Sequence, residues 1–137
     1  MRPAPLVLLL ALGGCPLSGR SGECEFDQDC DGDNVCGRDS LCHLPSDVRA
    51  VRAVWTIAGQ AANTTTCAAT PQLYISFLSA NDGDNLAYSP VPCFAGQFSM
   101  DKLPNRFTRV ELGVDDGSGH DFADIDSDGV AAFDLTF

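Results

Sequence analysis

The sequence predicts an all-β protein: a small antiparallel β-sandwich preceded by a disulfide-rich knot and an N-terminal signal peptide. Three observations support this. From residue 47 onward, apolar and polar residues alternate with a period of two, which is typical of strands with one buried face. No stretch has helical periodicity, and about six or seven short strands fit two packed sheets. Four evenly spaced cysteines in a segment with almost no apolar side chains predict the knot.

Residues 1–14 have the features of a signal peptide. Arg2 precedes an apolar run over residues 5–12, which is shorter than the ~20 residues that span a bilayer. The run leads into Leu-Gly-Gly-Cys at residues 12–15. This pattern resembles the lipobox of bacterial lipoproteins. The resemblance implies cleavage before Cys15, a diacylglyceryl group on its sulfur and often an acylated amine. An ordinary signal peptide followed by a chance cysteine is the alternative.

The cysteine count and the charge agree with export. The chain has seven cysteines, and lipidation of Cys15 leaves six. In the oxidising compartment that an exported protein meets, six cysteines predict three disulfides. The net charge of −11 becomes −12 once the signal, with its single arginine, is removed. A chain this acidic should repel nucleic acid and anionic headgroups. We therefore expect membrane attachment through the acyl chains on Cys15.

Residues 15–23 are expected to form the lipidated tether, and residues 24–46 the knot. The knot cysteines are Cys24, Cys30, Cys36 and Cys42, with five residues in every gap. Three pairings are open to them. The interleaved pairs Cys24–Cys36 and Cys30–Cys42 are favoured because sequential pairs would leave two unconnected loops. A zinc site is disfavoured because zinc modules usually have gaps of about two to four residues.

Residues 24–30 form the run Cys-x-x-Asp-x-Asp-Cys, and two more cysteines follow it. This arrangement resembles small knot modules in predicted secreted lipoproteins of myxobacteria. A looser likeness, in spacing alone, is to cysteine-rich modules of animal extracellular proteins. Neither resemblance implies an activity.

Residues 47–137 are expected to form the sandwich domain. Strands are predicted at residues 51–57, 73–78, 98–100, 110–114 and 131–137. An extended segment at 86–94 is placed at a sheet edge because its two prolines cannot donate to a ladder. Residues 59–66 and 115–129 are expected to be polar loops, and Cys67 is expected to pair with Cys93. The aromatic residues expected in the core are Trp55, Phe77, Phe98, Phe107, Phe133 and Phe137.

Two acidic runs have the spacing of a calcium loop. Asp124, Asp126 and Asp128 precede Gly129, and these match the first three ligand positions and the turn glycine of an EF-hand. The run Asp27, Asp29, Asp31 and Gly32 has the same spacing. Neither run has a glutamate at the twelfth position, and their flanks are not helical. We therefore expect at most weak Ca²⁺ binding at Asp124, Asp126 and Asp128, with a solvated acidic loop as the alternative.

Motifs of catalysis are missing from the sequence. His120 lies beside Asp121 and close to Ser118, but the members of a catalytic triad usually converge from separate elements. We expect a protein that is not an enzyme and is lipid-anchored to the bacterial cell envelope, at the outer membrane on its periplasmic or surface side. It would act as a binding or structural module with a protein or glycan partner. A calcium-stabilised extracellular structural protein is the alternative, and a small envelope hydrolase is least favoured.

Overall fold

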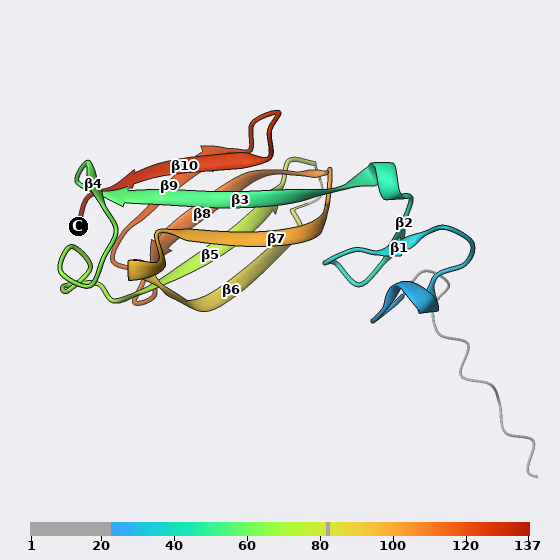
Figure 1. Cartoon of the computed structure of the whole chain (residues 1–137), viewed down its shortest axis with the longest axis horizontal. Coiled ribbons are helices and arrows are strands. Elements are labelled where there is room, and N and C mark those ends of the chain that lie inside the picture. Colours follow the sequence, from blue (N-terminus) through green and yellow to red (C-terminus); the bar gives the residue numbers. More distant parts are fainter. Residues whose placement is uncertain (1–22, 82) are drawn as a thin grey trace, which may run out of the picture.

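The computed structural model describes residues 23–81 and 83–137. Two four-stranded sheets pack face to face, and a small cross-linked knot lies at one end of them (Figure 1). Within the described residues the regular structure is β-strand and short 3-10 helix, without an α-helix. The predicted all-β fold with a disulfide-rich segment is therefore confirmed.

The knot, residues 24–46, contains little regular structure. Its elements, with the short helix that spans its end, are η1 (Asp27–Asp29), β1 (Val35–Cys36), β2 (Cys42–His43) and η2 (Pro45–Asp47). Strands β1 and β2 form an antiparallel hairpin. Of residues 24–46, only Cys24 and Gly37 are buried, so apolar packing cannot hold this segment. Disulfides join Cys24 to Cys36 and Cys30 to Cys42, the same interleaved pairs that the spacing favoured.

The first sheet is built around the long strand β3. Its strands are β3 (Val48–Ile57), β4 (Gln60–Ala61), β7 (Gln97–Pro104) and β10 (Val130–Leu135). The second sheet has the order β6-β5-β8-β9. Its strands are β5 (Gln72–Ser79), β6 (Asn85–Pro92), β8 (Phe107–Val114) and β9 (His120–Asp124). Strand β6, with its two prolines, lies at an edge, as the sequence predicted.

One hydrophobic core fills the space between the sheets. In β3, Val51, Ala53, Trp55 and Ile57 are buried while the residues between them are not, so the predicted period of two is confirmed. Strands β5, β8 and β10 bury their own alternating residues against the same cluster. The indole N–H of Trp55 donates to the carbonyl of Cys93 at 2.7 Å. This bond satisfies a polar group that the core would otherwise leave unpaired.

The third disulfide, Cys67–Cys93, is buried beside this bond. It joins the loop before β5 to η3 (Cys93–Ala95), the short helix between β6 and β7. Each sulfur therefore belongs to the core and also fixes a connection at its rim.

Three sequence predictions differ from the structure. The segment 115–129 is not a continuous loop, because it contains β9, which pairs with β8. Strand β9 has no buried residue, so it has no apolar alternation to reveal it. Strand β10 runs parallel to β3, since it follows a turn that carries the chain from one sheet to the other. Phe137 lies beyond the end of β10 and is exposed, not in the core.

Candidate functional site

The junction between knot and sandwich begins at an irregularity in β7. Ala50 of β3 lies opposite two residues of β7, Asp101 and Lys102, because the register shifts between Arg49 and Val51. This arrangement is a β-bulge, in which one extra residue bends the strand and redirects its side chains. Lys102 adopts the left-handed conformation, with φ of 52°. That conformation costs a residue with a Cβ roughly 1–2 kcal/mol, so the surroundings must hold it in place.

Both bulge residues contact the knot. The ammonium of Lys102 lies 2.7 Å from each carboxylate oxygen of Asp27, and its carbonyl accepts the Arg38 N–H at 3.1 Å. Asp101 accepts from the guanidinium of Arg38 through its carboxylate, and also through its carbonyl at 3.2 Å. The bulge therefore presents two side chains and two carbonyls to one face of the knot.

These contacts favour the ionised carboxylates. The Lys102 ammonium, followed by the Cys36 amide that donates to Asp27 at 3.0 Å, lowers the pKa of Asp27. The Arg38 guanidinium in turn lowers the pKa of Asp101. All four charged side chains keep substantial contact with solvent, so each pair stabilises the junction only modestly.

A second, more buried connection runs through Asp39. Its side chain is only 5 % exposed, and Oδ2 lies 3.0 Å from Nη2 of Arg106, in the turn between β7 and β8. Oδ1 lies 2.9 Å from Nε2 of His43. Arg106 also contacts Asp84 at 2.7 Å and stacks on the ring of Phe107, 4.7 Å from its centroid. Because a buried carboxylate needs such partners, Asp39 fixes the orientation of the knot hairpin on the sandwich.

A hollow of about 520 Å³ lies between the two parts. Its lining comes from three places: the η1 segment, the β1–β2 hairpin and the β7 bulge. The lining residues are Cys24, Glu25, Phe26, Asp27, Gln28, Cys36, Gly37, Arg38, Ser40, Asp101 and Lys102. Phe26 is 60 % exposed, and it is the one large apolar side chain among them. The hollow therefore combines an exposed aromatic ring with a polar wall in which both cations, Arg38 and Lys102, are paired with carboxylates.

The acidic run Asp27, Asp29 and Asp31 has a role in folding the knot. Asp27 forms the contacts described above. The carboxylate of Asp29 accepts the backbone N–H groups of Phe26 and Glu25, both at 2.9 Å, and these amides lower its pKa. The carbonyl of Asp31 accepts the N–H of Asn34 at 3.4 Å. The Asp27 and Asp29 side chains are thus occupied by contacts within the protein.

The other acidic run, Asp124, Asp126 and Asp128, spans the end of β9 and the turn before β10. Asp124 ends β9, whereas Asp126 caps the turn: its Oδ1 accepts the N–H groups of Asp128 and Val130 at 2.9 and 2.8 Å. Across residues 23–81 and 83–137, three potential metal-ligand atoms lie within 4.8 Å of one another only at Cys24, Cys30 and Cys42. The carboxylates of Asp124, Asp126 and Asp128 are not brought together in that way.

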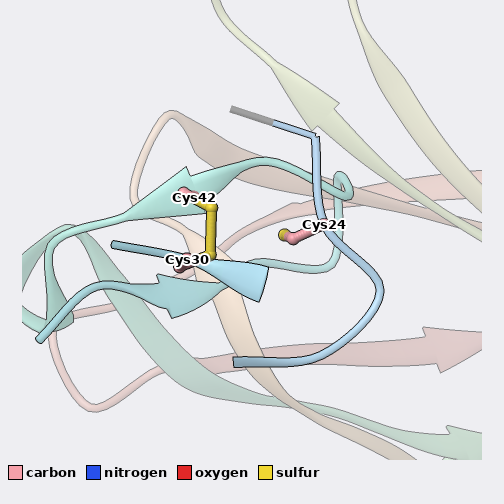
Figure 2. A group of neighbouring side chains, drawn as sticks. All are labelled: Cys24, Cys30 and Cys42. Carbon is pink, nitrogen blue, oxygen red and sulfur yellow. A yellow bond between two sulfur atoms is a disulfide. The ribbon is translucent and has the colours of Figure 1, made fainter. Parts of the chain in front are cut away.

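The three cysteines that do converge are not free thiols. Cys30 is bonded to Cys42, and Cys24, which Figure 2 shows beside that bond, is bonded to Cys36. Metals bind thiolates, and sulfur in a disulfide offers none. The cluster is therefore the cross-linked centre of the knot.

Two other sequence-predicted positions are Cys15 and His120. Cys15 lies outside the described residues. His120 is exposed on β9, where its ring meets that of Phe122 edge-on at 5.2 Å between centroids. A small hollow of about 160 Å³ brings His120 near Asp134, but the Asp134 carboxylate already accepts from the Gly59 amide and the Thr56 hydroxyl, both at 2.7 Å.

Among residues 23–81 and 83–137, none of the helices has the length and apolar character needed to traverse a bilayer. Comparisons of the chain with family models, with curated proteins and with solved structures found no match. Functional inference therefore depends on the residues themselves.

Proposed function

We propose that the chain is a lipid-anchored protein of the bacterial cell envelope whose folded part is a non-enzymatic binding module. One observation carries the proposal: six of the seven cysteines form three disulfides, and the remaining one is Cys15. That residue follows Leu-Gly-Gly, where a lipoprotein has its acylated cysteine. Three disulfides also suit an oxidising compartment.

The binding role is supported by the junction hollow. Ligand sites are concave, are often found between structural units, and combine apolar surface with a few fixed polar groups. The hollow has this character, because the exposed Phe26 lines it together with hydrogen-bonding groups from the knot and β7. Two disulfides and two ion pairs hold those groups in place.

The anchoring proposal is tested by expression of the full chain in a bacterium fed a labelled fatty acid. We expect the label on the protein and recovery in the detergent phase. Cys15→Ser should lose both, because the sulfur and the cleavage site are removed together. Ser18→Ala, three residues further on, is the matched control and should keep both. A Cys15→Ser protein that stays labelled and in the detergent phase would rule out Cys15 as the anchor.

A further inference from the structure

We propose that the junction hollow binds a neutral saccharide, with Phe26 as the stacking platform. This deepens the binding role proposed above and rests on it for the expectation that the natural ligand is an envelope glycan. The proposal depends on one exposed aromatic residue that lines the hollow together with positively charged hydrogen-bond donors and negatively charged acceptors.

The backbone that carries the ring is tightly constrained. Phe26 follows Cys24 by two residues and precedes Cys30 by four, and both cysteines are in disulfides. Its backbone N–H donates to the Asp29 carboxylate at 2.9 Å, and its carbonyl accepts the Asp29 N–H at 3.0 Å. Because this backbone is already ordered, binding at Phe26 needs little further ordering of the segment, so more of the contact energy appears as affinity.

The charges of the polar wall disfavour an anion or a metal ion as the ligand. The two cations of the lining, Arg38 and Lys102, are each paired with a carboxylate. Glu25 adds a further negative charge to the lining, so the site offers an anion no net attraction. A metal cation would need three converging ligand atoms, and in the described ranges such a group is limited to the bonded cysteines.

The same wall suits a polyhydroxylated ligand. Sugar hydroxyls both donate and accept, so they can use the remaining lone pairs of the Asp27 and Asp101 carboxylates together with N–H groups of Arg38. Gln28 and Ser40 add an amide and a hydroxyl to the lining. The apolar C–H face of a sugar ring can lie against Phe26, as a flat apolar surface does on an aromatic ring. A volume of about 520 Å³ lies within the ~300–1,000 Å³ range of ligand pockets.

The test is an NMR titration of the full chain, labelled with ¹⁵N. The protein is purified in detergent micelles from whichever cell fraction contains it. The probes are two neutral oligosaccharides, the N-acetylglucosamine trimer and maltotriose, and an anionic one, the galacturonic acid trimer. We expect at least one neutral probe to shift the amide signals of Phe26, Gln28 and Arg38. The anionic probe should bind at least about tenfold more weakly than the neutral one, because the negatively charged chain repels it.

Variants locate the binding. Phe26→Ala should lower the affinity about tenfold or more, whereas Phe26→Tyr, which keeps the ring, should change it little. Phe94→Ala is the matched control, because Phe94 is 54 % exposed but lies on η3, outside the hollow. A well-dispersed spectrum of Phe26→Ala would show that the variant is folded.

Three results would overturn the saccharide proposal. They are the absence of shifts with both neutral probes, shifts centred away from the junction, and equal losses in Phe26→Ala and Phe94→Ala. None of these depends on whether Cys15 is acylated. Failure of this inference is therefore distinguishable from failure of the anchoring proposal.

Discussion

Lys102 has a left-handed backbone conformation, and its ammonium lies 2.7 Å from both carboxylate oxygens of Asp27. The backbone strain and the ion pair thus coincide where the sandwich contacts the knot. The bulge directs Lys102 and Asp101 toward Asp27 and Arg38, and a regular strand would not present two consecutive side chains to one neighbour. Formation of the junction therefore depends on keeping the strained residue in place.

Two substitutions at Lys102 separate these effects. Lys102→Ala and Lys102→Gly both remove the ion pair, but only glycine adopts the left-handed conformation without strain. We expect the glycine variant to be more stable than the alanine variant by about 0.5–1 kcal/mol, measured by urea denaturation. Equal stabilities, or a more stable alanine variant, would contradict the left-handed assignment at this position.

Acid should weaken the junction through Asp27. The Lys102 ammonium lowers the pKa of this carboxyl below its ordinary value of 3.8. The folded protein then binds the proton less tightly than the unfolded chain does. The contribution of Asp27 to stability is therefore complete above the unfolded-state pKa and is lost as the pH falls through the lower folded-state pKa.

The measurement is the melting temperature of wild type and Asp27→Asn between pH 7 and pH 2. We expect wild type to melt higher at pH 7, and the difference to shrink toward zero below the ordinary carboxyl pKa of 3.8. Asp33→Asn changes the same charge in the knot at an exposed position, and its difference from wild type should be smaller at pH 7. A difference for Asp27→Asn that is constant with pH would argue against the ion pair.

Gly37 is expected to tolerate no side chain, because the side chains of Asp39 and His43 pack against it. A Cβ at this position would lie 2.6 Å from Cδ2 of His43 and 2.8 Å from Oδ1 of Asp39. Gly37→Ala should therefore disturb the hairpin and destabilise the protein by about 1–3 kcal/mol in urea denaturation. Gly119→Ala is the control, since a Cβ there meets no atom within 4 Å and should have little effect. Similar losses in both variants would mean that the close packing around Gly37 is not the cause.

Much of the fold could be predicted from the sequence because burial leaves a periodic trace. Strand β3 alternates buried and less buried residues over its second half, and the prolines of β6 indicated an edge. Strand β9 left no such trace, because none of its residues is fully buried and backbone hydrogen bonds to β8 hold it. The direction of β10 depends on the path between the sheets, and no local pattern records that path.

The junction site could not be predicted, for a related reason. Lys102 and Asp27 are far apart in the sequence, and their contact needs a bulge in β7 and a left-handed residue other than glycine. Neither feature has a compositional signal here, since lysine gives no indication of positive φ. The acidic runs, by contrast, had a strong signal but an ambiguous one. Aspartates at alternate positions suit a calcium loop and equally suit side chains that cap turns.

Asp126 provides the test that distinguishes a turn cap from a calcium ligand. Its Oδ1 accepts the N–H groups of Asp128 and Val130, and the turn closes on Gly129, which has φ of 78° and lies under the carbonyl of Ala50. Asparagine keeps the accepting oxygen but removes one of the three negative charges, and a lower ligand charge weakens calcium binding. We therefore expect Asp126→Asn to cost at most about 0.5 kcal/mol and Asp126→Ala about 1–2 kcal/mol, because alanine loses both bonds.

The same variants are then melted in millimolar calcium, in millimolar magnesium and in chelator. If the turn role is correct, both ions give wild type and Asp126→Asn the same small rise, which is the screening expected of a strongly acidic chain. A rise that is selective for calcium in wild type, and is reduced or lost in Asp126→Asn, would instead establish the weak site at Asp124, Asp126 and Asp128. Because asparagine preserves the turn, such a loss could not be attributed to misfolding of the loop before β10.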